Sequence, residues 1–299
     1  MMTDAWRCPK KRYRKNGFHF PPLFQQPEKT PPKGQWLRLL LLAVSLVLVA
    51  APTHAAGLVV DHTSANAFAT IPQSGLAAAR QKTVAWYTHT SHGSQLYTGL
   101  NMLVDEGYAL PPGFTDNYAT DLGNDNWDVL TRTWLDAHPE TNLVMWSWCG
   151  QLSWMSDSEV DAYLYKMQTL ETEYPGVVFV YMTGHLDGSG PSGTLYRNND
   201  RIRAYCREHA KVLFDFADIE SYNPDGTYFP DETDACGWCQ TWCEGHACPT
   251  NCNEGDCAHS HCFNCYRKGL ATWYMLARLA GWSPAGGVAP ANSLLLEGQ

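Results

Sequence analysis

The sequence predicts an α/β protein with three layers: an open parallel sheet and helices on both of its faces. Two observations lead to this prediction. Four segments have the apolar, β-rich composition of strands, and segments with the periodicity of amphipathic helices separate them. Strands that alternate with helices pair in parallel, because each crossover helix returns the chain to the same edge of the sheet. In such sheets, functional sites form where the carboxyl ends of the strands meet.

The predicted strands span residues 83–91, 141–148, 176–184 and 211–219. The third segment, GVVFVYMTG, is apolar throughout, which is typical of a strand that is buried on both faces. Before it, Ser156 and Glu159 have the spacing of a capping box, so a helix is expected to begin there. Further helices are expected over 198–210 and 266–282, and the segment that starts at Ser94 would form a helix after the first strand.

The N-terminal part of the chain is expected to be an export signal. Residues 1–55 combine a basic, proline-rich extension with a signal peptide, whose apolar run from Leu39 to Ala51 is too short to span a bilayer. Cleavage is expected near Ala56, and an uncleaved membrane anchor is the alternative. One domain would then occupy residues 56–282, followed by a flexible tail over 283–299, in a secreted or periplasmic protein without stable membrane insertion.

The exported part of the chain is acidic. Residues 56–299 contain 12 Lys and Arg and 28 Asp and Glu, which gives a net charge of −16. Because an acidic surface repels phosphate backbones, no nucleic-acid partner is expected.

Eight of the eleven cysteines lie within residues 236–265, just before the last predicted helix. In an exported chain, this crowding predicts a disulfide-rich insertion. Zinc is the alternative, because two C-x-x-C pairs have histidines beside them. Of the other three, Cys8 lies in the predicted export signal, and Cys149 and Cys206 would either bridge each other or be buried as small apolar residues. The cysteines expected to form disulfides are Cys149, Cys206, Cys236, Cys239, Cys243, Cys248, Cys252, Cys257, Cys262 and Cys265.

Candidate functional residues lie at the ends of the predicted strands. Ser91 follows the first strand at a turn with glycine, where a serine can expose its hydroxyl and offer its N–H group to an oxyanion. Gly150 and Gln151 follow the second strand and could donate two hydrogen bonds to a developing negative charge. His185 and Asp187 follow the third strand and are a secondary candidate acid–base pair.

Asp256 and His259 stand three residues apart just before the last predicted helix. Serine needs a base to act as a nucleophile, and a carboxylate can hold that base, a histidine, in one tautomer. The three-residue spacing lets a single tight turn bring the Asp256 carboxylate to the His259 ring. The alternative is that this pair only hydrogen-bonds within the disulfide-rich loop.

Three features follow one another along the chain: a serine after the first strand, a polar turn after a middle strand, and D-x-x-H before the C-terminal helix. Together they resemble the SGNH (GDSL-type) hydrolase superfamily over roughly residues 80–282. The resemblance implies that Ser91 is the nucleophile, that His259 is the base and that Asp256 orients it. The segments HTSHGSQ, MWSWCGQ and YMTGHLDG also resemble a group of uncharacterised secreted bacterial proteins.

The resemblance also implies an oxyanion hole. Its donors would be the N–H group of Ser91, Gly123 in the segment DLGNDNW, and Gly150 with Gln151. Gln151 would supply the carboxamide that an asparagine supplies in the superfamily, and its side chain is one methylene longer.

We therefore expect a secreted serine esterase that acts through an acyl-enzyme on a small-molecule or glycan ester, such as an acetylated glycan. Trp146, Trp148 and Trp154 flank the predicted oxyanion turn, where an indole would suit stacking on a sugar ring. The alternative is a non-catalytic extracellular module that binds glycan in the same cleft. No cofactor or metal is expected, although the acidic loop 225–234 has oxygen ligands that would suit calcium. The sequence does not define the oligomeric state.

Overall fold

The computed structural model describes residues 57–249, 251 and 255–285. Within these ranges, six strands form one open, all-parallel sheet in the order β1-β6-β5-β4-β2-β3. The strands are β1 (Leu58–Val60), β2 (Val84–His89), β3 (Gly113–Tyr118), β4 (Leu143–Trp146), β5 (Val178–Met182) and β6 (Val212–Phe214). The predicted fold class, with helices on both faces of the sheet, is confirmed.

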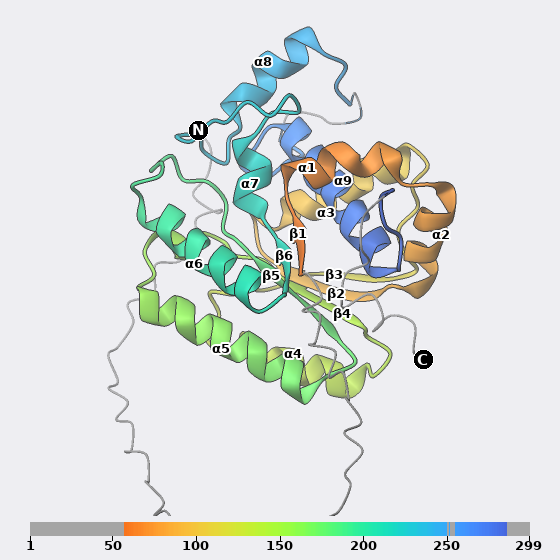
Figure 1. Cartoon of the computed structure of the whole chain (residues 1–299), viewed down its shortest axis with the longest axis vertical. Helices are drawn as coiled ribbons and strands as arrows, with labels where there is room; N and C mark the ends of the chain where they lie inside the picture. The colour runs from red at the N-terminus through yellow and green to blue at the C-terminus, as the bar shows by residue number, and fades with distance from the viewer. Residues whose placement is uncertain (1–56, 250, 252–254, 286–299) are drawn as a thin grey trace, which may run out of the picture. The chain divides into compact units, whose positions relative to one another are not determined.

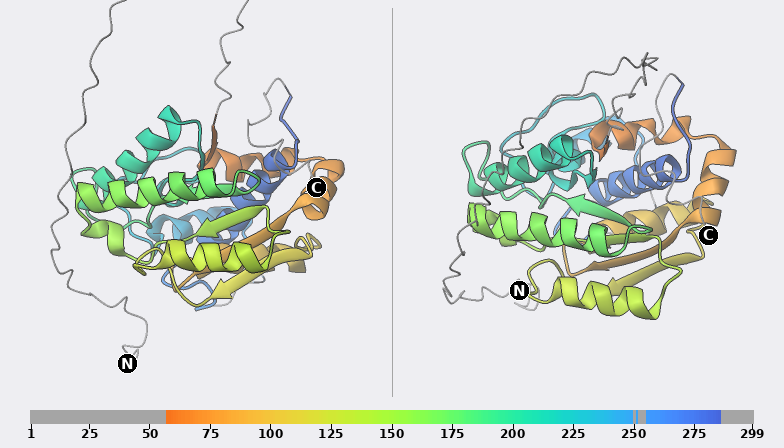
Figure 2. Two further views of the ribbon diagram at one scale, coloured as in Figure 1. Left: turned by 90° about the horizontal axis from the view of Figure 1, so that it is seen from below. Right: turned by 60° about the horizontal axis from the view of Figure 1, so that its bottom comes forward.

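Two layers of helices cover the sheet (Figure 1). One layer consists of α4 (Trp127–Ala137), α5 (Asp157–Glu173) and α6 (Thr194–Glu208). The other consists of α1 (His62–Ala67), α2 (Gln73–Lys82), α3 (Ser94–Asp105) and α9 (Cys262–Leu279). The shorter elements are η1 (Phe68–Thr70), η2 (Gln151–Ser153), α7 (Phe216–Ser221) and α8 (Gly237–Gly245). In both views of Figure 2, α5 and α6 lie together, and the blue α9 lies beside the orange α1 and α2.

The direction of the chain connections reverses between β2 and β4, which are neighbours in the sheet. The chain leaves β2 through α3 toward β3, whereas it leaves β4 through α5 toward β5 on the other side. Such a reversal opens a crevice at the carboxyl ends of the two strands, because the outgoing loops turn away from each other. The predicted nucleophile and the predicted oxyanion turn follow these two strands.

The four predicted strands are confirmed as β2, β4, β5 and β6, and the capping box of Ser156 and Glu159 begins α5. Two strands were not predicted. β1 has only three residues, and β3, with the sequence GFTDNY, is an edge strand whose residues are all at least partly exposed. The apolar run of β1, LVV, is short, and β3 lacks the apolar run that marks the central strands.

Helix α9 is buried over most of its surface and packs against α3 through two glycines. A Cβ atom on Gly99 would lie 1.8 Å from the carbonyl oxygen of Cys265, and one on Gly269 would lie 2.4 Å from the backbone of Gly99. Only glycine permits this approach. It brings the turn that precedes α3 close to the loop that precedes α9.

The insertion at residues 236–265 is disulfide-rich, as predicted. Its bonds are Cys236–Cys239, Cys243–Cys248 and Cys257–Cys265. Cys149 and Cys262 are disulfide-bonded as well, while Cys252 lies outside the described residues. Cys206 is instead a free, buried thiol, so the prediction of a disulfide there is wrong. Its side chain fills space between α6 and the sheet, where burial raises the pKa of the thiol.

The disulfides indicate a protein of an oxidising, extracytoplasmic compartment. No helix in the described ranges combines the length and the apolar character needed to cross a membrane. The predicted signal peptide and most of the predicted C-terminal tail lie outside the described residues.

Candidate functional site

The turn after β2 places Ser91 and His92 at the carboxyl edge of the sheet. A Cβ atom on Gly93 would lie 2.1 Å from Ser147 Oγ, so glycine is required where this turn passes the end of β4. Ser91 is 5% exposed, and its Oγ lies 3.5 Å from Cys149 Sγ. The same sulfur lies 3.5 Å from His92 Nδ1. The turns after β2 and β4 therefore meet, as the reversal of the chain connections requires.

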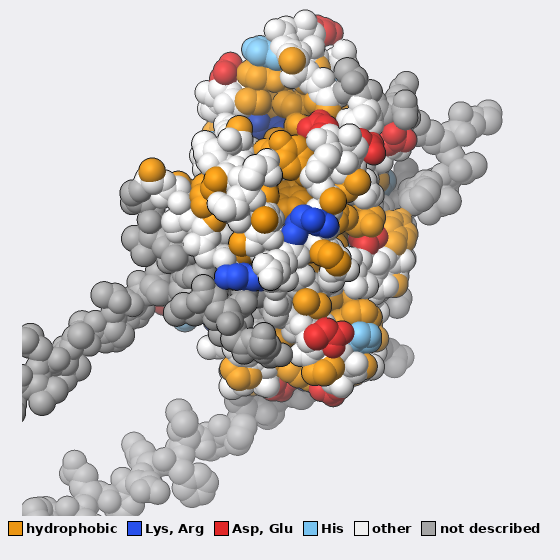
Figure 3. Space-filling view, turned by 90° about the vertical axis from the view of Figure 1, so that its right-hand side faces the viewer, with side chains coloured by type: hydrophobic (Ala, Val, Ile, Leu, Met, Phe, Trp, Pro, Cys, Tyr) orange, Lys and Arg blue, Asp and Glu red, His pale blue; other side chains and the backbone are white. Residues whose placement is uncertain are grey.

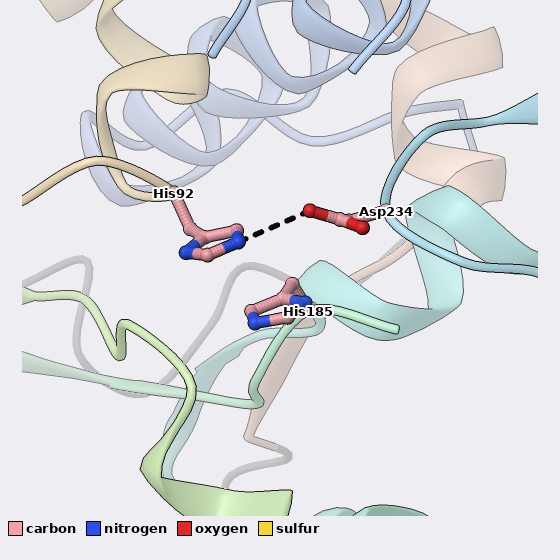
Figure 4. Close-up of side chains that lie close together, drawn as sticks. All are labelled: His92, His185 and Asp234. Carbon is pink, nitrogen blue, oxygen red and sulfur yellow. Dashed lines mark hydrogen bonds and ion pairs between the residues drawn. The ribbon is translucent and has the colours of Figure 1, made fainter. Parts of the chain in front are cut away.

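Three histidines from distant segments stack beside this turn. The ring of His92 lies 3.7 Å from that of His185, which follows β5, and the two planes differ by 3°. The ring of His259 stacks on His92 as well, with a centroid distance of 4.3 Å. His92 also hydrogen-bonds through Nε2 to Asp234 Oδ2 at 3.0 Å (Figure 4). The edge of the sheet thus carries three imidazoles and one carboxylate.

Hydrogen bonds fix the tautomers of two of these rings. The Asp234 carboxylate accepts from His92 Nε2, so the lone pair of the neutral His92 ring is at Nδ1. His185 Nδ1 donates to the carbonyl oxygen of Leu186 at 2.8 Å, which leaves the lone pair of this ring at Nε2. A Cβ atom on Gly150 would lie 3.6 Å from this Nε2, so Gly150 keeps the space in front of it open.

Burial and neighbouring charges set the protonation states of His92 and Asp234. Burial lowers the pKa of His92 to about 4, and the other two histidines add to this effect, although the hydrogen bond to Asp234 opposes it. For Asp234, burial would raise the pKa, but the hydrogen bond from His92 and the nearby histidines lower it below its ordinary value. Near neutral pH, His92 is therefore neutral and Asp234 is ionised.

Two of the four residues predicted to form the oxyanion hole donate hydrogen bonds to Asp121. Gly123 N donates to Asp121 Oδ1 at 2.7 Å, and Gln151 Nε2 donates to the same oxygen at 3.0 Å. Gln151 Oε1 accepts from the N–H group of Cys149 at 2.9 Å. Thr90, the neighbour of Ser91, donates to the other oxygen of Asp121. This carboxylate therefore ties the turns after β2 and β4 together, and it engages two of the donors that were assigned to an oxyanion, Gly123 and Gln151.

His185 and Asp187, the secondary candidate acid–base pair, are not joined by a hydrogen bond in the described part of the chain. Asp187 accepts instead from Ser153 Oγ at 2.6 Å and from Ser189 N at 3.0 Å. Burial would raise the pKa of Asp187, but these hydrogen bonds lower it. His185 belongs to the histidine stack, whereas Asp187 lines the neighbouring cavity.

The structure brings His259 to the predicted edge, where it adopts a left-handed backbone conformation with φ of 61°. Among the described residues, no hydrogen bond joins His259 to Ser91. The backbone oxygen of Asp256 accepts from Thr98 Oγ1 at 3.4 Å. The triad of Ser91, Asp256 and His259 stays a prediction.

A cavity of about 210 Å³ opens next to the histidine stack, between the loop after β5, α6 and α7. Its lining includes Asp187, Arg203, Asp218, Tyr222 and Tyr228, and the last two rings stack on each other. A Cβ atom on Gly150, which would lie 3.6 Å from His185 Nε2, would also lie 3.6 Å from the ring of Trp154. That indole is 48% exposed, whereas Trp146 and Trp148 are buried in the core.

Sequence reasoning missed the pairing of His92 with Asp234 and the role of Asp121. His92 lies at the end of a predicted strand, but its partner Asp234 is 142 residues away. Asp234 belongs to the acidic loop 225–234, whose oxygen ligands suited calcium. No local spacing could have revealed this pair.

No protein-family model matches the chain, and no curated protein matches it either. The all-parallel sheet is consistent with the architecture of SGNH hydrolases, and this likeness concerns the fold alone.

Proposed function

We propose that the protein is an exported ester hydrolase that acts on a carbohydrate ester, with Ser91 as its nucleophile. One observation carries the proposal: Ser91 lies at the chain-reversal edge of a parallel sheet, in the same turn as His92, on which the rings of His185 and His259 stack. A serine hydroxyl is a weak nucleophile without a base, and imidazole is the side chain best suited to that role near neutral pH.

In the proposed reaction, Ser91 Oγ attacks the ester carbonyl carbon while a histidine of the stack takes its proton. His259 is assigned as this base because its ring stacks on His92, the neighbour of Ser91, and because the resemblance gives it that role. The C–O bond then breaks, and the proton passes to the leaving alcohol. Water hydrolyses the acyl-serine by the same route and restores both groups.

The surroundings of the site favour a sugar as the alcohol part of the ester. The exposed Trp154 offers an apolar face for a pyranose ring. The cavity beside His185 presents tyrosines, carboxylates and a guanidinium, which suit the hydroxyl groups of a sugar. The net charge of −16 over residues 56–299 does not suit a phosphate-rich ligand. Basic side chains are also few and scattered on the face in Figure 3, which is the right-hand side of the molecule in Figure 1.

The test compares Ser91→Ala with Ser94→Ala. Ser94 lies one helical turn further along, where its hydroxyl donates to the carbonyl oxygen of Ser91 at 2.6 Å. We expect Ser91→Ala to abolish hydrolysis of acetylated oligosaccharides and labelling by a fluorophosphonate, while Ser94→Ala keeps both. Turnover and labelling that survive in Ser91→Ala would reject the assignment.

A glycan-binding module without turnover is the second candidate. The engagement of Gly123 and Gln151 by Asp121 favours it, because an esterase needs donors aimed at the oxyanion. This function predicts that the wild-type protein binds the oligosaccharide but releases no acetate. It also predicts that Trp154→Ala weakens binding, whereas Ser91→Ala leaves binding unchanged.

A further inference from the structure

Three side chains of types that bind metal ions converge at the carboxyl edge of the sheet. His92 follows β2, His185 follows β5, and Asp234 precedes the first disulfide of the Cys-rich insertion. One ligand atom of each residue lies within 4.8 Å of the ligand atoms of the other two. Figure 4 shows the two rings one above the other, with the carboxylate beside them.

We propose that His92, His185 and Asp234 bind one Zn²⁺ ion. Two imidazoles and one carboxylate are a donor set of catalytic zinc sites, in which water or substrate takes the fourth position. The same donor set also suits Fe²⁺, but an oxidising compartment, which the disulfides indicate, does not keep iron in that state. The proposal goes beyond ester hydrolysis and does not depend on it.

The partly buried position of the cluster suits a bound ion. The side chains of His92 and Asp234 are 12% and 20% exposed, so an ion could enter from solvent and would still be shielded on most sides. Under the loop that carries His185, the Leu186 N–H donates to Glu220 Oε2 at 2.6 Å. The Asp234 N–H donates to the carbonyl oxygen of Leu186 at 3.1 Å. Two of the three ligands are thus anchored to the same short segment.

Binding requires a small, definable rearrangement. Zinc–ligand bonds of about 2.0–2.2 Å place tetrahedral ligand atoms about 3.4 Å apart. Because the present separations are within 4.8 Å, the ligand atoms must approach one another by at most about 1.4 Å. The stacked rings of His92 and His185 must also tilt apart. If His92 binds through Nε2, its proton moves to Nδ1, where Cys149 Sγ lies 3.5 Å away as a weak acceptor.

His259 is not one of the proposed ligands. Its contact with the cluster is ring stacking on His92, and a tetrahedral ion with three protein ligands keeps one position for water. The zinc stoichiometry should therefore be the same in His259→Ala as in the wild-type protein.

The decisive experiment is zinc titration of the full-length protein after treatment with a chelator, without reductant so that the disulfides stay intact. Isothermal titration calorimetry gives stoichiometry and affinity, and Co²⁺ in place of Zn²⁺ gives visible absorption bands that report four-coordinate geometry. Asp234→Asn and His185→Gln keep the approximate shape of each side chain. We expect one equivalent of Zn²⁺ for the wild-type protein and at least about 100-fold weaker binding for each variant, more than loss of an outer-shell partner usually costs.

A second group of similar composition supplies the control. Asp61, His62 and Asp218 also offer ligand atoms within 4.8 Å of one another, but with only one imidazole. Asp61 caps α1, and Asp218 is hydrogen-bonded to His62. Asp218→Asn should leave the zinc affinity unchanged. Far-ultraviolet circular dichroism of every variant verifies that it is folded.

Three results would overturn the proposal. The first is a wild-type protein that takes up no stoichiometric zinc. The second is zinc binding that survives in the folded double variant of Asp234→Asn and His185→Gln. The third is loss of binding in Asp218→Asn or His259→Ala, which would place the ion elsewhere or change its ligand set.

Discussion

Replacing Lys268 with methionine is expected to destabilise the protein by about 3–5 kcal/mol, the usual cost of removing one partner of a buried ion pair. Lys268 Nζ lies 2.7 Å from Glu220 Oε1, and neither side chain has exposed surface. Methionine fills a similar volume without the charge. The Glu220 carboxylate would then stay buried with only hydrogen bonds from the backbone of Leu186 and from the amide of Asn264.

The same network supports two of the stacked histidines. Glu220 accepts from the backbone N–H group of the residue that follows His185. Gln95, which accepts from Lys268, donates at 2.6 Å to the carbonyl oxygen of the residue that precedes His259. Loss of the ammonium should therefore lower the proposed esterase activity by more than the unfolded fraction explains.

Urea unfolding with intact disulfides, followed by tryptophan fluorescence, measures the change in the free energy of unfolding. Arg201→Met is the matched control, because Arg201 and Asp161 form an ion pair of 2.6 Å with side chains that are 39% and 53% exposed. Its loss should cost less than about 1 kcal/mol. The double variant of Lys268→Met and Glu220→Gln removes both charges and should be more stable than the sum of the single losses predicts. The reasoning is refuted if Lys268→Met costs no more than Arg201→Met, or if the two single losses simply add.

Three further changes test separate parts of the structure. Gly93→Ala should cost about 1–3 kcal/mol in urea unfolding, because its Cβ would collide with Ser147, whereas Gly245→Ala should be nearly neutral because no atom lies within 4 Å of the new Cβ. Burial would raise the pKa of Asp128, but hydrogen bonds from a lysine and an arginine lower it below 3.8. A carboxyl whose pKa is lower in the folded protein stabilises the fold above pH 3.8, and this contribution is lost as the pH falls through the pKa of the folded state. The wild-type protein should therefore lose stability below pH 4 faster than Asp128→Asn. Equal dependence of the unfolding free energy on pH in the two proteins would contradict this. Cys206 should react with a thiol reagent only after unfolding, and labelling of the native protein at this residue would show that it is not buried.

The central part of the fold could be predicted because its strands are buried on both faces. β4 and β5 are apolar at every position, and such runs are unambiguous when amphipathic helices separate them. β3 could not be recognised, because an edge strand can keep polar residues such as Asp116 and Asn117 at no cost in desolvation. Hydrophobic periodicity reports burial, so it detects the centre of a sheet and misses its edges.

The site was predicted in place but not in composition. Ser91 comes to the carboxyl edge because the rule for parallel sheets depends only on topology, whereas His259 reaches the same edge from the loop before α9. Asp121 and Asp234 could not be found, since a carboxylate shows no sequence signal for the hydrogen bonds that it accepts from distant segments. Local spacing instead drew attention to the pair of Asp187 with His185, which share no hydrogen bond in the described structure.

The disulfide-rich insertion is best understood as part of the site and not as an appendage to it. Asp234 lies two residues before Cys236, and His259 lies two residues after Cys257, so each of these candidate site residues is close to a disulfide. The His261 N–H donates to the carbonyl oxygen of Ala235 at 3.2 Å, which joins the two segments directly. Of the four clustered residues, His92 and His185 follow strands of the sheet. Asp234 and His259 lie in loops that are not part of the sheet. Covalent cross-links limit the freedom of such a loop where hydrogen bonds between strands are absent. The cysteines therefore crowd where positional accuracy is needed and regular secondary structure is scarce.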